Sequence, residues 1–222
     1  MANYIKAMGL ELEAGWKEKP KIAGIKLVRD SSISAKGYEY EMVTKPYKRK
    51  RNILKTIKKA IAYIDETPLS CGIHIHISLK EKEEYYNLLS TKFIKYYEKK
   101  LNNYSLRKGK DYGKLRERIK NSRWCKEYKE KTKKEILMLI EEQAIYGRNR
   151  YYGVNFSLSK HGTIEFRSFP STKNILFIKN TIIFLEKTVN SFIEKYNNKD
   201  LQCTLQCNII EEEEEEIKEV IV

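Results

Sequence analysis

The chain has 222 residues and a formal net charge of +14, from 44 lysines and arginines against 30 aspartates and glutamates. Its length and its hydrophobic content of 41% are ordinary for a globular protein and allow one large domain with a proper core, or two small ones. The longest aliphatic run covers residues 136–140, far short of the roughly 20 residues that cross a bilayer, which excludes a membrane-spanning helix.

Two further features bear on the compartment. The four cysteines show no C-x-x-C spacing, which indicates neither a zinc site nor a disulfide framework. The first residues run into a predicted strand without the apolar core of a signal peptide. We therefore expect a cytoplasmic protein with reduced thiols and no membrane partner.

The charge is unevenly distributed along the chain. Residues 211–222 hold seven glutamates and one lysine, a net of −6, which leaves +20 on residues 1–210. Residues 107–134 hold thirteen basic and four acidic residues, a local net of +9. A basic body favours anionic partners such as nucleotides, nucleic acid or an acidic polymer, without choosing among them. The basic stretch is typical either of solvated helix faces or of a groove for a polyanion.

The chain begins with alternating apolar and acidic residues. In residues 9–13, Gly-Leu-Glu-Leu-Glu, the leucines share one face and Glu11 and Glu13 share the other. Successive side chains of a strand point to opposite faces, so this segment is predicted to be a strand with a polar side. A second strand is predicted at residues 22–29, where apolar residues also dominate.

A third strand is predicted at residues 37–43, and its alternation places Glu39 and Glu41 on one face. The period then changes, because apolar residues recur at intervals of three and four from residue 48 to residue 65. This pattern predicts an amphipathic helix with a lysine-rich outer face.

The strongest strand signal lies at residues 72–78, Gly-Ile-His-Ile-His-Ile-Ser. Isoleucines alternate there with His74 and His76, so one face is apolar and the other carries two imidazoles about 7 Å apart. Such a pair suits neighbouring contacts to a metal ion or a phosphate. Two histidines that only hydrogen-bond at a wet sheet surface would have the same spacing.

Helices dominate the next part of the chain. Residues 81–146 are rich in Lys, Glu, Arg and Tyr and predict several helices, separated at Gly109 and Gly113. A long helix is predicted to begin near Thr172, because apolar residues step by three and four as far as Phe192.

A β-hairpin is predicted between these helical parts. Its strands cover residues 151–158 and 163–167 and are joined by a turn at 160–162. Alternation in the second strand places Glu165 and Arg167 on the polar face. Near the end of the chain, a short strand is expected at residues 201–210, followed by a disordered acidic run.

The predicted strands share one pattern, an apolar row on one side and ionisable groups on the other. We therefore expect an α+β fold, in which a curved antiparallel sheet carries helices on its apolar face. The exposed face would then collect seven ionisable residues: Glu11, Glu13, Glu41, His74, His76, Glu165 and Arg167.

Several carboxylates on one surface repel one another unless cations neutralise them. Oxygen-rich sites with an occasional imidazole suit Mg²⁺ or Mn²⁺ better than a structural zinc. Ions that also bind phosphates would explain the nearby arginines, which are Arg148, Arg150 and Arg167. The sequence leaves open whether Asp30, Glu39 and Arg148 belong to the site.

Four motifs, taken together and in this order, resemble the amidoligase family. They are G-L-E-L-E (9–13), G-I-H-I-H-I-S (72–78), R-Y-Y-G-V-N-F (150–156) and T-I-E-F-R-S-F (163–169). The resemblance implies membership of the carboxylate–amine ligase superfamily, with the fold of glutamine synthetase and glutamate–cysteine ligase. The catalytic domain would span residues 1–200, with a basic helical insert at about 81–146 and an acidic tail at 201–222.

The same resemblance implies an ATP-dependent ligase. ATP would phosphorylate a carboxylate, and an amine would attack the acyl phosphate to give an amide. The implied metal ligands follow the matched motifs and are Glu11, Glu13, Glu41, His74 and Glu165. His76 would lie near the nucleotide or the acyl phosphate, while Arg150 and Arg167 would bind phosphate. Glu165, Arg167 and His76 are therefore the expected catalytic residues.

The sequence departs from the family where Lys45 precedes Pro46 and where the lysine-rich insert occurs, so the carboxylate and amine substrates stay open. They include peptides, cell-wall fragments and small amino acids. Three other interpretations remain. The chain could be a basic, tyrosine-rich nucleic-acid-binding protein. It could be a metal-dependent hydrolase that uses His74 and His76, or a degenerate ligase scaffold kept for binding.

Overall fold

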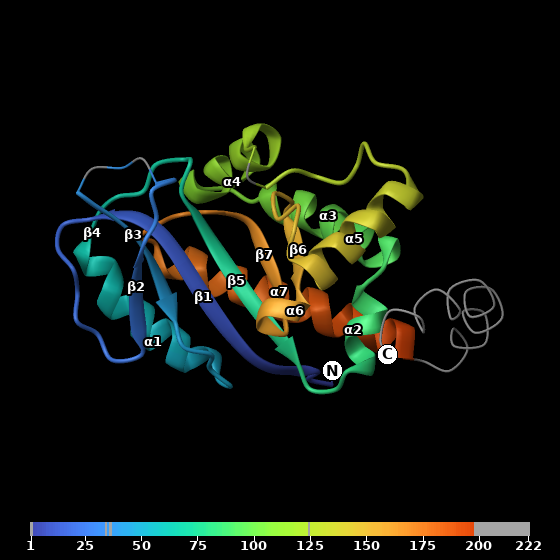
Figure 1. Ribbon diagram of the computed structural model, residues 1–222. Helices are drawn as coiled ribbons and strands as arrows, with labels where there is room; N and C mark the ends of the chain where they lie inside the picture. The colour runs from blue at the N-terminus through green and yellow to red at the C-terminus, as the bar shows by residue number, and fades with distance from the viewer. Residues whose placement is uncertain (1, 34, 36, 124, 198–222) are drawn as a thin grey trace.

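The computed structural model describes residues 2–33, 35, 37–123 and 125–197. Within these residues the chain forms one seven-stranded sheet with the strand order β2-β3-β1-β5-β7-β6, and β4 pairs with β1 beside that path (Figure 1). Every pair of neighbouring strands is antiparallel. The strands are β1 (Ile5–Trp16), β2 (Ile25–Arg29), β3 (Tyr38–Thr44), β4 (Ile64–Glu66), β5 (Gly72–Leu79), β6 (Val154–Ser157) and β7 (Thr163–Pro170). The α+β class expected from the sequence is confirmed.

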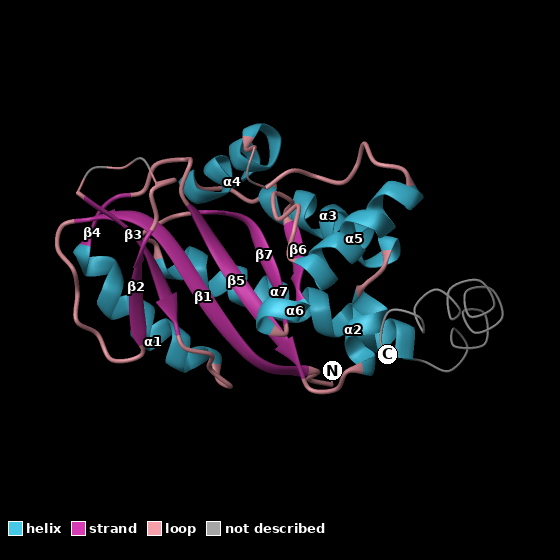
Figure 2. Cartoon of the chain, viewed as in Figure 1, coloured by secondary structure: helices cyan, strands magenta, loops and turns pink. Residues whose placement is uncertain are grey.

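The helices are α1 (Lys50–Ala60), α2 (Glu83–Leu88), α3 (Thr91–Ser105), α4 (Lys110–Asn121), α5 (Lys133–Tyr146), α6 (Leu158–His161) and α7 (Ile175–Asn197), with a 3₁₀ turn at Ile61–Tyr63. Helices α1 and α7 lie behind the sheet, α3 and α5 lie on its β6 side, and α4 lies at the ends of β5 and β7 (Figure 2). Within the described residues, no helix is both long and apolar enough to cross a membrane. The strand and acidic run predicted after residue 200 lie outside the described residues.

The apolar sides of the strands form the core against α7. Ile73, Ile75 and Ile77 of β5 are at most 1% exposed, as the strict alternation predicted. The apolar stripe of α7 packs into the same cluster, where Ile178 and Leu185 are fully buried. Burying a large aliphatic side chain contributes about 1.5–3 kcal/mol, so this layer supplies much of the drive for folding.

Two local predictions were wrong in part. The predicted helix at 48–65 ends at Ala60, because Ile64 enters β4 and fills the core from a strand instead. Gly109 precedes α4 with φ 126°, a backbone conformation that favours glycine, but Gly113 lies inside α4. A glycine inside a helix costs roughly 1 kcal/mol, and burial of Leu115, two residues later, contributes about 1.5–3 kcal/mol in the other direction.

The hairpin exists, but its strands and connection differ from the prediction. Only Val154–Ser157 of the first strand is extended, and Leu158–His161 forms the short helix α6 instead of a simple turn. Gly162 ends α6 in the left-handed region with φ 59°, which glycine adopts without strain. The second strand continues to Pro170, and the long helix after it begins at Ile175.

The polar side of the sheet is largely buried, not exposed as the alternation predicted. Glu165 is 0% exposed and His74 is 2% exposed. The ionisable side chains pack against one another, and α4 packs against β7. Buried charges are costly unless they are paired, so this face carries strong internal electrostatics.

Candidate active site

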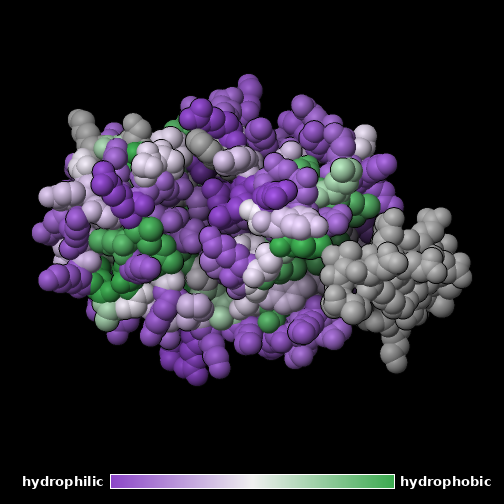
Figure 3. Space-filling model, viewed as in Figure 1, coloured by the Kyte–Doolittle hydropathy of each residue, from purple (hydrophilic) through white to green (hydrophobic). Residues whose placement is uncertain are grey.

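The register of the strands places the four motifs side by side. Glu11 of β1 stands opposite His74 of β5, and Glu13 stands opposite Glu41 of β3. His76 stands opposite Glu165 of β7. Directly opposite residues on neighbouring strands point to the same face, so these side chains converge. Figure 3 shows hydrophilic residues gathered over the middle of this face.

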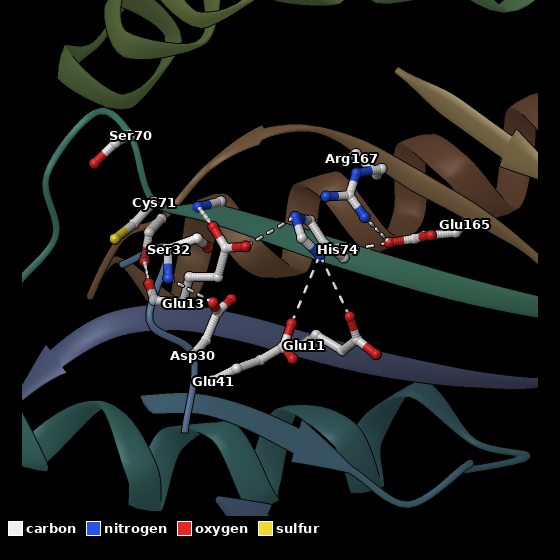
Figure 4. Close-up of polar contacts among 12 residues, drawn as sticks. Glu11, Glu13, Asp30, Ser32, Glu41, Ser70, Cys71, His74, Glu165 and Arg167 are labelled. Carbon is white, nitrogen blue, oxygen red and sulfur yellow. Dashed lines mark hydrogen bonds and ion pairs between the residues drawn. The ribbon is translucent and has the colours of Figure 1, made fainter. Parts of the chain in front are cut away.

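His74 lies at the centre of the cluster, with carboxylates on several sides (Figure 4). Its Nδ1 is 3.3 Å from Glu11 Oε2 and 3.5 Å from Glu165 Oε1. A third carboxylate oxygen, Glu41 Oε1, is 3.8 Å from the same nitrogen. On the other side of the ring, Nε2 is 3.5 Å from Glu13 Oε1. One imidazole therefore connects acids from three strands beside its own.

Within the part of the chain that the structure describes, two groups of side chains could hold a metal ion. Glu11, Glu41 and His74 form one group, and Glu11, His76 and Glu165 form the other. Glu11 belongs to both, with Oε2 near His74 Nδ1 and Oε1 3.1 Å from His76 Nε2. Carboxylate oxygens with one imidazole each are the donor set expected for Mg²⁺ or Mn²⁺.

The buried carboxylates differ in their protonation. Burial on its own would raise the pKa of Glu11, but the His74 and His76 imidazoles outweigh it and hold the pKa well below its usual range. Burial likewise opposes ionisation of Glu165, but Arg167 and the two histidines lower its pKa to about 2. Both side chains are therefore anions at neutral pH.

Glu41 behaves in the opposite way. Burial and the charges of Glu11, Glu13 and Asp30 raise the pKa of Glu41 to about 9, so this carboxyl is protonated at neutral pH. In Figure 4 the turn that carries Asp30 lies beside Glu41 and Glu13. The acids at this end of the site thus exceed the cations that the described side chains supply.

Glu165 is the contact point for the cationic side chains. Arg167 Nη1 is 2.5 Å from Glu165 Oε1, and Arg150 Nη2 is 3.6 Å from Oε2. Asn155 Nδ2 donates to the same Oε2 at 2.6 Å. Among the described residues, the Nε atoms of both arginines have no hydrogen-bond partner although they are buried. These guanidinium groups therefore retain donors that a further anion could use.

His76 lies between the two carboxylates and the edge of the site. Burial favours its neutral form, but the Glu11 carboxylate outweighs burial and raises the pKa of His76. Its Nδ1 is 3.1 Å from Thr163 Oγ1, which fixes the direction of the ring. The third histidine, His161, lies edge-on to His76 with the ring centroids 6.1 Å apart.

All eight site residues predicted from the sequence lie on this face, but not in equivalent positions. Glu13 lies outside both candidate metal groups, whereas His76 lies in one of them. Of the three residues left open, Asp30 lies near the acids, while Glu39 stands opposite Gly15 at the end of β1. Arg148 is exposed, with its guanidinium over the Tyr146 ring.

The sequence reasoning gave no role to Asn155 or Thr163. Asn155 stands opposite Glu165 and is fully buried. Both residues lie on the polar side of their strands, so the alternation that identified the glutamates also identifies them. What the alternation could not show is that each one hydrogen-bonds a predicted site residue.

Comparison with known proteins gives one match. A family model described as "Putative amidoligase enzyme" matches residues 13–189, a span that holds every predicted site residue except Glu11. No curated protein and no solved structure matches this chain. The matched span covers most of the chain and includes the buried cluster of acids, histidines and arginines. The chain belongs to the amidoligase family.

Proposed function

We propose that this protein is an ATP-dependent carboxylate–amine ligase that forms an amide through an acyl phosphate. The observation that carries the proposal is the convergence on one buried face of Glu11, both histidines and Glu165 with two arginines. Acids alone would suggest only a cation site. Acids can bind the metal ion of a metal–ATP complex, and neighbouring arginines with unused donors can bind the phosphate that is transferred. The proposal includes a glutamine synthetase-like arrangement of the catalytic domain.

The donor set supports Mg²⁺ or Mn²⁺ as the cofactor. We assign Glu11, Glu41, His74 and Glu165 as metal ligands, with Glu13 next to them. His74 directs Nδ1 toward Glu11 and Glu41, the two carboxylates of its candidate metal group, and His76 Nε2 lies 3.1 Å from Glu11 Oε1 in the other group. Bound divalent ions would neutralise the carboxylates and the phosphate oxygens during transfer.

The arginines would act on the phosphoryl group. In the first step a substrate carboxylate oxygen would attack the γ-phosphorus of ATP, so that an O–P bond would form as the bond to ADP breaks. Negative charge spreads over the phosphoryl oxygens, so fixed donors near them lower the barrier. We assign this role to Arg167 and Arg150, whose positions Glu165 fixes.

The second step would form the amide. The amine nitrogen would attack the acyl carbon, phosphate would leave with the electrons of the C–O bond, and the proton lost by the nitrogen would pass to the departing phosphate. We place His76 beside the acyl phosphate, where its raised pKa favours the protonated ring as a donor to a phosphate oxygen. The substrates would be a small-molecule or peptide carboxylate and an amine, in the cytoplasm.

The other functions have weaker support. A nucleic-acid-binding protein would have no use for buried acids around two histidines. A metal-dependent hydrolase is consistent with His74 and His76, but it would not need arginines with unused donors at Glu165. We therefore favour the ligase.

Metal binding should release protons. Glu41 has a pKa raised to about 9, and an ion can only bind its ionised form, so binding at pH 7 must expel that proton. We expect metal affinity to rise about tenfold per pH unit toward pH 9 and then to level off. Calorimetry in two buffers that differ in their enthalpy of ionisation gives the number of protons released per metal ion bound. Glu41→Gln, which has no such proton, is the control. A pH-independent affinity in the wild type would contradict the assignment of Glu41.

The proposal is tested by calorimetry of Mg²⁺ or Mn²⁺ binding with and without a non-hydrolysable ATP analogue. We expect binding that strengthens when the nucleotide is present, because the ions would contact both the carboxylates and the phosphates. Absence of divalent-ion binding in both conditions would exclude the ligase. Binding of the metal that the nucleotide leaves unchanged would favour the hydrolase.

A further inference from the structure

Arg118 on α4 is a charged side chain buried outside the two candidate metal groups. It is 1% exposed, and its Nη1 donates to three successive main-chain carbonyls. The acceptors are the oxygens of Leu69, Ser70 and Cys71, at 3.0, 3.0 and 3.1 Å. Burying a guanidinium is costly, so a position that keeps one against main-chain oxygens calls for a physical reason.

The reason lies in the peptide that joins Cys71 to Gly72. Its carbonyl oxygen accepts from Arg118 and also from the Ser171 amide, at 3.1 Å each. Its N–H, on Gly72, donates to Glu13 Oε2 at 2.6 Å. A trans peptide is planar, so its C=O and N–H point in opposite directions. Fixing the carbonyl therefore fixes the direction in which the N–H meets Glu13.

The same contacts lead to His74. Glu13 uses Oε2 for the Gly72 amide, and its Oε1 is 3.5 Å from His74 Nε2. A side chain at Gly72 would lie 2.3 Å from Arg118 Nη2 and 3.2 Å from His74 Nε2. Only glycine leaves room for both, so the guanidinium and the imidazole share the space beside this peptide. Figure 4 shows Cys71, Glu13 and His74 at this end of the site.

Neighbouring residues on α4 make related contacts. Lys114, one turn before Arg118, donates to Thr67 O at 3.3 Å. Asp111 accepts from Thr172 Oγ1 and from Asn174 Nδ2, both at 2.8 Å. One face of α4 thus holds the segment that enters β5 and the segment that leaves β7. These two strands carry His74, His76, Glu165 and Arg167.

We propose that Arg118 is a positioning residue of the active site. It orients the Cys71–Gly72 peptide, which holds Glu13 and through it the Nε2 side of His74. This gives part of the basic insert a role within the site, distinct from binding a polyanion. The predicted effect of Arg118 on metal binding rests on the proposed function, whereas its effect on the position of His74 does not.

The chain offers a matched control for Arg118. Arg116 lies on the same helix and also donates from Nη1 to main-chain carbonyls, those of Ser105 and Arg107, but it is exposed. Arg118→Lys and Arg116→Lys both keep the charge and remove the planar fork. Because the chemical change is the same in both variants, a difference between them is caused by the position of the replaced arginine.

The first readout is the imidazole NMR spectrum of the full chain labelled with ¹⁵N-histidine. The chain has three histidines, so each ring can be followed separately. We expect Arg118→Lys to shift the His74 ring signals and to leave those of His161 in place, while Arg116→Lys shifts none. An unchanged His74 signal in folded Arg118→Lys, or equal shifts in both variants, would overturn the inference. If Arg118→Lys does not fold, Arg118→Gln, which keeps an N–H donor for the carbonyls, should shift the His74 signals and leave those of His161 in place; unchanged His74 signals would likewise overturn the inference.

The second readout is Mn²⁺ binding by the full chain. Loss of a group that orients a ligand typically weakens metal affinity 10–100-fold, so we expect about a tenfold loss in Arg118→Lys and none in Arg116→Lys. Equal affinities in the two variants would contradict the inference. Absence of Mn²⁺ binding in the wild type would overturn the proposed function instead, while the NMR comparison would still decide the role of Arg118.

Discussion

Replacement of Glu11 by glutamine is expected to remove most divalent-ion binding and most activity. Glu11 is the one carboxylate common to both candidate metal groups in the described structure, with one oxygen toward His74 and the other toward His76. Glutamine keeps the shape, but it replaces an anionic oxygen by an amide nitrogen that cannot bind a cation. We expect metal affinity to fall by on the order of a hundredfold or more, and turnover to fall at least as far.

Glu39→Gln provides the control for Glu11→Gln. Glu39 lies on β3 and points to the same side of the sheet as Glu41. Its replacement therefore removes one negative charge from the side of the sheet that carries Glu11. It belongs to neither metal group among the described residues. Calorimetry should therefore give Glu39→Gln an affinity within about twofold of the wild type. Equal affinities in Glu11→Gln and Glu39→Gln would contradict the shared role of Glu11.

Replacement of Arg167 by lysine should abolish most amide formation while metal binding persists. The Arg167 side chain is 12% exposed, and Nη1 contacts Glu165 while its Nε has no partner among the described residues. Lysine keeps the charge, but it lacks the fork that can hold a carboxylate and a phosphate oxygen together. Loss of one such contact in a transition state typically costs on the order of a hundredfold or more in rate.

Arg148→Lys is the matched control for Arg167→Lys. Arg148 is exposed and stacks over Tyr146 at 5.6 Å, away from Glu165. Steady-state rates with saturating ATP and Mg²⁺ should fall in Arg167→Lys and stay near the wild-type value in Arg148→Lys. If both variants retain full turnover, Arg167 has no part in phosphoryl transfer.

Much of the site could be predicted because strand alternation is local. Residues two apart share a face, so Glu11 and Glu13, or His74 and His76, need no knowledge of the rest of the fold. Which of these side chains meet also depends on the register of the strands. β1 pairs with β5, about sixty residues further along the chain. The sequence does not encode that register locally: the alternation common to the strands predicted that these side chains share one face, but not which of them stand opposite one another.

Other features depended on tertiary contacts that periodicity cannot show. Ile64 fits the apolar stripe of a helix as well as the inner side of β4, and the pairing with β1 decided between them. Glu165 reads as a solvated strand acid, yet Asn155 and Arg167 bury it completely. Arg118 was one charge in a basic stretch, and its burial against three carbonyls of the segment before β5 distinguishes it from its exposed neighbours.

The central claim, acyl-phosphate chemistry, is tested most directly with hydroxylamine. This small, strong nucleophile intercepts an acyl phosphate as a hydroxamate. Wild-type protein given ATP, Mg²⁺, hydroxylamine and a panel of carboxylates should form a hydroxamate and ADP with at least one carboxylate, and none without ATP. ATP turnover across a broad panel with no hydroxamate, or product release that needs no ATP, would contradict the account.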